Sequence, residues 1–199
     1  MYDQKTAEIF IQKVNQFVED QLDGCVPQKS RDKTIHDPIW GSVLYYSWEI
    51  QLIDTPIFQR LRGINQLGMA NLTYPAAHHT RYEHSLGTAA IAARMIGKLQ
   101  ERYARQKKDS GFEITQQDVC KIRLAALLHD IGHCVYSHLS EQIYKNMPEF
   151  KNITEYIKET CDQLISPKPH EIFSYLILTS SAFCRFFHTF IAVSYTHLS

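Results

Sequence analysis

Three histidines and an aspartate lie within the segment LLHDIGHCVYSH, residues 127–138, directly after a run of aliphatic residues. An ionisable side chain at the end of an apolar segment is costly to bury unless it is paired, hydrogen-bonded or bound to a metal. Imidazole nitrogen and carboxylate oxygen together suit a divalent ion such as Mn, Fe, Zn or Mg. His129 and Asp130 are therefore candidate metal ligands, and His84 is a third donor from an earlier part of the chain.

A His-Asp pair is not decisive alone. A histidine in the last turn of a helix interacts favourably with the helix dipole, and the next aspartate can begin a turn. The alternative for His129 and Asp130 is therefore a helix end without a metal. Two neighbouring motifs favour the metal, because RYEHSLG upstream and PHEIFSYLIL downstream supply further histidines and carboxylates.

The same region holds groups suited to phosphate chemistry. Glu141 follows His138 by three residues, the spacing at which two side chains meet on a helix, and such a carboxylate can orient an imidazole for proton transfer. Arg81 presents a fork of donors that matches phosphate oxygens. The alternatives are ordinary hydrogen-bonded histidines and a surface ion pair of Arg81.

These motifs, in this order, resemble the HD-domain metal-dependent phosphohydrolases, and within them the deoxynucleoside triphosphate triphosphohydrolases (dGTPase-like). The resemblance runs through IHDPIWGSV, IDTPIFQRLRGINQLG, YPAAHHTRYEHSLG, LLHDIGHCVYSHLSE and the HE of residues 170–171. It implies an all-α HD-domain helical bundle with a small N-terminal β-hairpin, one divalent metal ion as cofactor and a nucleotide substrate. The motifs are more specific for the fold and the site than for the substrate.

The resemblance also implies roles for individual residues. The metal ligands it implies are His84, His129 and Asp130. Of the residues around the reacting phosphate, His133 would contact the α-phosphate, His138 with Glu141 would be the acid or base, and His170 would line the same pocket. The implied substrate-binding residues are Gln66 and Leu67, at the sugar and base, and Arg81, at the phosphates.

The family's metal site has a fourth ligand, an aspartate well beyond the HE motif. No aspartate follows Glu171 in this sequence. We therefore expect residues 1–193 to form a single, C-terminally truncated HD domain, and residues 194–199 to be a non-native tail. Three protein ligands can still hold an ion, as catalytic metal sites often do.

Composition narrows the class of protein. The 199 residues include 21 basic and 21 acidic side chains, so the formal net charge is zero. Such a balance does not indicate binding to nucleic acid or to acidic membranes. The five scattered cysteines form no C-x-x-C pair and suggest neither a disulfide framework nor a thiolate zinc site. Without an apolar membrane span or a signal peptide, we expect a cytoplasmic protein. A homo-oligomer is expected by family analogy alone.

Local patterns predict the elements that must position these residues. Apolar periodicity predicts helices over 4–22, 85–106, 116–130, 153–165 and 170–178. Pro56 after Thr55 predicts a further helix over 56–67, and residues 34–47 and 70–75 are predicted as a hairpin and an extended piece. Thr115 and Asp118 resemble a capping box. The site residues His129 and Asp130 should then lie in the last turn of a helix.

Three functions compete at this stage. The leading hypothesis is hydrolysis of deoxynucleoside triphosphates to deoxynucleoside and triphosphate. An HD-type phosphomonoesterase or phosphodiesterase is the second. The third, of a different class, is an inactive fragment or nucleotide-binding module that lacks the fourth metal ligand.

Overall fold

Helices make up most of the computed structural model, which describes residues 3–25, 31–106, 113–160 and 167–192. The two strands, β1 (Lys33–Asp37) and β2 (Gly41–Tyr45), form an antiparallel hairpin near the N-terminus. The helices are α1 (Gln4–Leu22), α2 (Ser47–Ile53), α3 (Pro56–Gln59), α4 (Arg81–Gln106), α5 (Gln116–Leu128), α6 (His138–Tyr144), α7 (Pro148–Thr160), α8 (Pro169–Leu178) and α9 (Ser181–Phe186). The predicted all-helical fold with a small hairpin is confirmed. The predicted tail, 194–199, lies outside the described residues.

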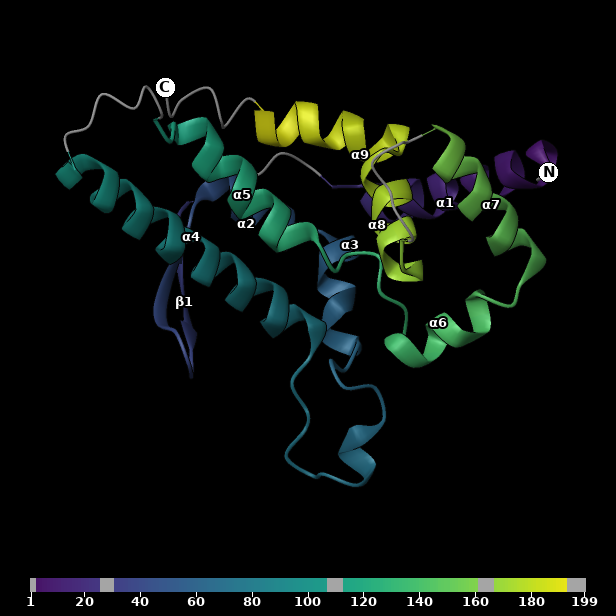
Figure 1. Ribbon diagram of the computed structural model, residues 1–199, viewed down its shortest axis with the longest axis horizontal. Helices are drawn as coiled ribbons and strands as arrows, with labels where there is room; N and C mark the ends of the chain where they lie inside the picture. Colours follow the sequence, from purple (N-terminus) through teal and green to yellow (C-terminus); the bar gives the residue numbers. More distant parts are fainter. Residues whose placement is uncertain (1–2, 26–30, 107–112, 161–166, 193–199) are drawn as a thin grey trace.

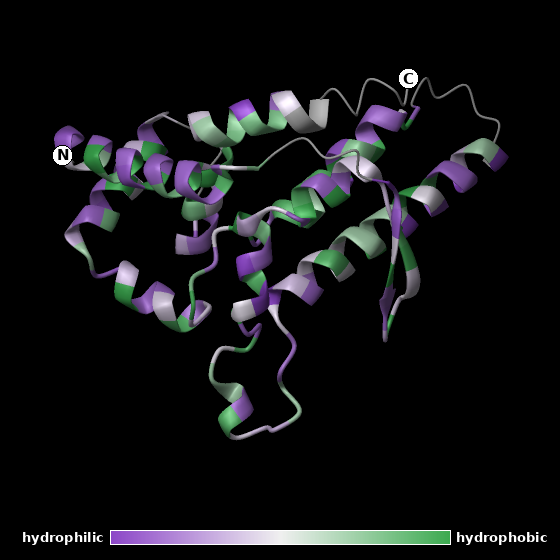
Figure 2. Cartoon of the chain, turned by 180° about the vertical axis from the view of Figure 1, so that it is seen from behind, coloured by the Kyte–Doolittle hydropathy of each residue, from purple (hydrophilic) through white to green (hydrophobic). Residues whose placement is uncertain are grey.

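Two apolar clusters hold the helices together. The larger one gathers α2, α3, α4 and α5 around side chains such as Trp48, Phe58 and Leu127. The smaller one joins α1, α7 and α8 through Phe150 and Ile172 among others. Figure 2 shows hydrophilic and hydrophobic residues mixed along most helices, as expected when each helix turns one face to a shared core. None of the helices in the described ranges has the length and apolar character of a membrane span.

The helices α4 and α5 bring distant parts of the chain together. They lie side by side and run in opposite directions, so the first turn of α4 meets the end of α5 (Figure 1). The hairpin is anchored to α4, because the Tyr45 hydroxyl donates to the carbonyl of Leu86 at 2.9 Å. The consequence is that Arg81 and His84, on α4, face the segment that follows α5.

The start of α4 differs from the sequence prediction. The helix begins at Arg81 rather than Ser85. Its first turn is held by Glu83, whose carboxylate accepts from the backbone N–H of Thr80 at 2.6 Å. This is the T-x-x-E spacing of a capping box, and it moves Arg81 and His84 into the helix.

The prediction of a helix over 56–67 is wrong beyond Gly63. The chain forms α3, which is capped by the Thr55 hydroxyl, and then a 3-10 turn over Arg60–Gly63. Asn65 then pairs with Thr80 as an isolated β-bridge, which takes the backbone out of the helix. The piece 70–75, predicted as extended, contains a 3-10 turn over Ala70–Leu72, and this whole excursion projects from the helices (Figure 1).

The remaining helices agree better with the prediction. The helix predicted over 4–22 has the bounds of α1, and α8 begins one residue before the predicted 170–178. The Thr115 hydroxyl accepts from the Asp118 N–H at 3.2 Å, so the capping box is confirmed. Helix α7 begins at Pro148, a favourable first position, five residues before the prediction, and residues 161–165 lie outside the described part.

A buried ion pair ties α2 to α5. The Arg123 guanidinium donates from Nε to Glu49 Oε1 at 2.8 Å and from Nη2 to Oε2 at 2.6 Å, with 6% and 0% of the two side chains exposed. Glu49 also accepts from the Tyr46 N–H at 2.8 Å. Removing one partner of such a pair leaves the other charge buried and uncompensated.

Glu49→Gln is therefore expected to lower the free energy of unfolding by about 3 kcal/mol. The matched control is Glu155→Gln, which removes an exposed pair with Lys158 at 2.9 Å and should cost less than about 1 kcal/mol. Urea unfolding followed by circular dichroism measures both. Equal losses for the two variants would contradict this account of the buried pair.

Candidate active site

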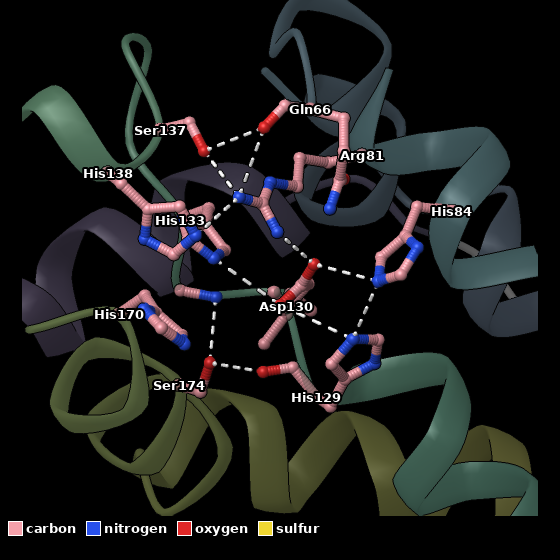
Figure 3. Close-up of polar contacts among 12 residues, drawn as sticks. Gln66, Arg81, His84, His129, Asp130, His133, Ser137, His138, His170 and Ser174 are labelled. Carbon is pink, nitrogen blue, oxygen red and sulfur yellow. Dashed lines mark hydrogen bonds and ion pairs between the residues drawn. The ribbon is translucent and has the colours of Figure 1, made fainter. Parts of the chain in front are cut away.

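Three metal-donor atoms converge where α4 meets the end of α5. The Nε2 atoms of His84 and His129 lie 3.3 Å apart. Asp130 presents Oδ2 at 3.6 Å from His84 Nε2 and Oδ1 at 3.3 Å from His129 Nε2. Figure 3 shows the three side chains pointing toward one another from two elements. We call these three residues the metal group.

Hydrogen bonds orient His129 as a metal ligand requires. Its Nδ1 lies 2.8 Å from the carbonyl of Ala126, which only a protonated Nδ1 can satisfy. In the neutral ring this tautomer leaves the lone pair on Nε2, the atom that faces His84 and Asp130. Its own carbonyl accepts from the Ser174 hydroxyl at 3.1 Å. Burial lowers the pKa of His84, against the opposing effect of Asp130, and favours the neutral ligating form. The donor set fits a divalent ion.

Asp130 stays ionised in this setting. Burial alone would raise the pKa of its carboxyl group, but contacts with His133, His129 and Arg81 outweigh burial and hold the pKa well below its usual range. The shortest of its contacts with charged or titratable side chains is the ion pair from Arg81 Nη1 to Asp130 Oδ2 at 2.6 Å, with 3% and 4% of the side chains exposed. The carboxylate is thus available as a charged ligand.

Arg81 extends this contact across the site. Its Nη2 donates to the Ser137 hydroxyl and lies 3.2 Å from His138 Nε2 and 3.4 Å from the carbonyl of Gln66 (Figure 3). Its Nε is buried and has no hydrogen-bond partner in the described part of the chain. The phosphate contact expected of Arg81 stays a prediction, and the structure adds that this guanidinium already braces Asp130.

A second group of four residues adjoins the metal group. This histidine cluster consists of His133, His138, Glu141 and His170. Glu141 Oε1 lies 2.8 Å from His138 Nδ1 and 2.5 Å from His170 Nδ1, so one carboxylate orients two rings. Burial would raise the pKa of Glu141, but the hydrogen bonds from both histidines lower it overall. The spacing predicted for His138 and Glu141 on a helix is found in α6.

His133 connects the two groups. Its side chain is 1% exposed, its ring stacks on that of His170 with centroids 4.0 Å apart, and its Nε2 lies 3.4 Å from Asp130 Oδ1. Its Nδ1 has no hydrogen-bond partner among the residues described, and its Nε2 has only this long contact with Asp130. Burial lowers the pKa of His133, which Asp130 only partly opposes. A neutral, buried and unsatisfied imidazole is costly, and a bound ligand would satisfy it.

The other predicted residues lie at the edge of the site. The backbone carbonyl of Gln66 accepts from Arg81 and from the Ser137 hydroxyl, each at 3.4 Å, while its side-chain Oε1 is buried without a hydrogen-bond partner among the described residues. Leu67 is 55% exposed. Substrate contacts for these two residues remain predictions.

Sequence reasoning missed two serines. Ser137 holds Arg81, and its positive φ of 51° is a backbone conformation that non-glycine residues rarely adopt. Ser174 accepts from the Gly132 N–H at 2.9 Å while it donates to His129. Neither serine, one just before α6 and one within α8, carries a sequence signal of its role, because each role depends on a partner far away in the sequence.

Gly132 packs directly on the backbone of α8. A Cβ added there would lie 2.2 Å from the His170 carbonyl oxygen and 2.3 Å from the Ser174 nitrogen. Both are main-chain atoms, so they cannot turn aside as a side chain can. The segment that carries Asp130 and His133 therefore needs glycine at this position.

Gly132→Ala is expected to destabilise the fold by about 2–4 kcal/mol, as overpacking and lost contacts do. The control is Gly97→Ala in the middle of α4, where a Cβ meets nothing within 4 Å and alanine should stabilise the helix by up to about 1 kcal/mol. Thermal unfolding compares them. If the Gly132→Ala protein is as stable as the wild type and binds the metal equally well, the close packing of residue 132 on α8 does not require glycine.

The comparisons with known proteins agree with this geometry. The model of the HD domain matches residues 81–183, more than half of the chain.

This chain belongs to the HD-domain family.

Curated relatives match the same part of this HD-domain chain. The deoxynucleoside triphosphate triphosphohydrolase SAMHD1 of Bos taurus is 40% identical over 107 residues, 54% of this chain and 17% of that protein. Its homologue in Dictyostelium discoideum is 34% identical over 131 residues, 66% and 24% of the two chains. An uncharacterised protein of Methanocaldococcus jannaschii is 41% identical over 109 residues, 55% and 21%. The chain spans only a minor part of the length of each relative.

His129→Ala should weaken Mn²⁺ binding to the HD domain by more than about 100-fold, because losing a direct ligand costs more than losing an outer-shell partner. His36→Ala is the matched control, since His36 lies on the hairpin and contacts Ser42 at 2.9 Å. Titration calorimetry with Mn²⁺ alone gives both affinities. Unchanged binding in His129→Ala would remove this residue from the metal group.

Proposed function

We propose that this chain is a phosphohydrolase that converts deoxynucleoside triphosphates into deoxynucleoside and inorganic triphosphate. The observation that carries the proposal is the convergence of three metal donors beside His133, a buried imidazole. Its Nδ1 has no hydrogen-bond partner in the described residues, and its Nε2 has only the 3.4 Å contact with Asp130. Metal donors, a cation and an orphaned buried imidazole together suit a phosphate ester. The relatives' printed name supports the choice of substrate.

A divalent ion held by His84, His129 and Asp130 would supply Lewis-acid chemistry, which activates water and withdraws charge from a phosphoryl oxygen. His133 binds the α-phosphate in this proposal, since a phosphate oxygen gives its buried ring the hydrogen bond that it lacks. Arg81 neutralises charge that develops on the phosphate. Its contacts with Ser137 and Asp130 hold the guanidinium in place before the substrate arrives.

His138 is the proposed acid. Glu141 Oε1 lies 2.8 Å from its Nδ1 and orients the ring, and 57% of the side chain is exposed, so a nucleotide can reach it. The other ring nitrogen of His138, Nε2, lies 3.2 Å from Arg81 Nη2. When Arg81 Nη2 turns to a phosphate oxygen of the substrate, Nε2 becomes free for proton transfer. His170, which shares Glu141 and stacks on His133, keeps the cluster aligned.

In the proposed reaction one bond to the α-phosphorus forms and another breaks. A water oxygen forms a bond to the α-phosphorus, and the bond between the α-phosphorus and the 5′-oxygen breaks. His138 gives a proton to the departing 5′-oxygen and regains one from the attacking water. In this proposal Gln66 and Leu67 contact the sugar and base. The buried Gln66 Oε1, which has no hydrogen-bond partner among the described residues, can accept from a ligand N–H or O–H.

Product analysis tests this function. The chain is incubated with Mn²⁺ and each of the four common deoxynucleoside triphosphates, and the products are separated by anion exchange. We expect deoxynucleoside and triphosphate in equal amounts. Orthophosphate or pyrophosphate as the phosphorus product would point to another phosphatase reaction, and no turnover at all would favour a binding module.

Variants link that activity to the site. His138→Asn should lower kcat by about 10²–10⁴-fold, the usual contribution of a general acid, without altering Mn²⁺ affinity. His36→Asn is the control and should keep both values. Full activity in His138→Asn would refute the assignment of the acid, while leaving the product analysis to decide the reaction.

A further inference from the structure

A cavity of about 330 Å³ lies between α1 and the segment that follows α5. Its walls are largely apolar, and four aromatic side chains supply much of them: Phe10, Phe17, Tyr144 and Phe173. A volume of this order is at the lower end of the range found for small-molecule sites, roughly 300–1,000 Å³. None of the metal ligands lines it, although His133 contributes to its wall.

Two cations line this apolar cavity. Arg60 enters from the 3-10 turn after α3, and Lys13 comes from the exposed face of α1. None of the described residues in the lining is an aspartate or glutamate. An apolar cavity with positive charge and no carboxylate is complementary to a ligand of the opposite kind, an anion with an apolar body.

Arg60 is a partly buried cation without a carboxylate partner in the cavity wall. Its guanidinium donates to the carbonyl of His133 at 2.7 Å and to that of Ile131, yet its Nε is buried without a hydrogen-bond partner among the described residues. Among the described residues, no aspartate or glutamate forms an ion pair with Arg60. Burial lowers the pKa of Arg60, as expected for a desolvated and uncompensated cation. Such a charge is costly to bury alone.

We propose that this cavity binds an amphipathic carboxylate, whose head group pairs with Arg60 and Lys13 and whose apolar body lies against the phenylalanines. The ligand would affect the active site through the main chain of residues 131–133, which Arg60 contacts. Arg60 holds the carbonyls on either side of Gly132, within the segment that presents Asp130 and His133, and His133 itself borders both the cavity and the histidine cluster. Of the residues assigned to the nucleotide, only His133 borders the cavity, and binding at Arg60 and Lys13 does not require the proposed function.

Calorimetric titration of the full chain with decanoate tests the proposal, without metal or nucleotide present. We expect saturable binding of one decanoate, with decanol and decyltrimethylammonium at least about tenfold weaker because they lack the negative head group. In ¹H–¹³C spectra, decanoate should shift the imidazole resonances of His133, and those of His36 on the hairpin should stay in place.

Charge variants locate the head group. Lys13→Glu should weaken decanoate binding about five- to tenfold, and Lys5→Glu is its matched control. Both lysines are exposed on α1 and both changes alter the net charge equally, but only Lys13 lines the cavity. Three outcomes would overturn the proposal: no binding of decanoate, equal binding of decanol and the ammonium analogue, or equal effects of Lys13→Glu and Lys5→Glu.

Discussion

The buried ion pair between Arg81 and Asp130 is the contact on which the site's arrangement depends. Burying two charges is costly, and the attraction between them compensates only when the geometry is good and further hydrogen bonds satisfy the remaining donors. Here the contact is 2.6 Å long, and the rest of the guanidinium reaches Ser137, His138 and the Gln66 carbonyl. The pair therefore fixes the carboxylate that the metal group needs and, through the same arginine, the position of His138.

This arrangement requires helix ends rather than helix middles. Arg81 and His84 lie in the first turn of α4, while His129 and Asp130 follow the last turn of α5. Adjacent residues in a regular helix point about 100° apart, so both could not face one ion from its middle. Leaving the helix at His129 removes that restriction, and the antiparallel packing of α4 and α5 brings the two ends together.

Patterns local in the sequence predicted much of this. The bounds of α1, the hairpin and the Thr115 capping box follow from spacing within a few residues. The metal group and the histidine cluster lie together in the structure, and the roles that the motifs imply for their residues stay predictions. The helix expected over 56–67 fails because Asn65 pairs with Thr80, a contact between residues far apart in sequence. The bracing of Asp130 by Arg81 and the positive φ of Ser137 were equally inaccessible, because they arise only once the elements have packed.

The hydroxyl of Ser174 links α8 to two positions of the segment that follows α5. It accepts from Gly132 and donates to His129, and it stands on the same helix as His170. A displacement of α8 would thus disturb a metal donor, the HD segment and the histidine cluster in one movement. The two halves of the site assemble or come apart as a cooperative unit, so a state with an ordered metal group and a disordered acid is disfavoured by the architecture itself.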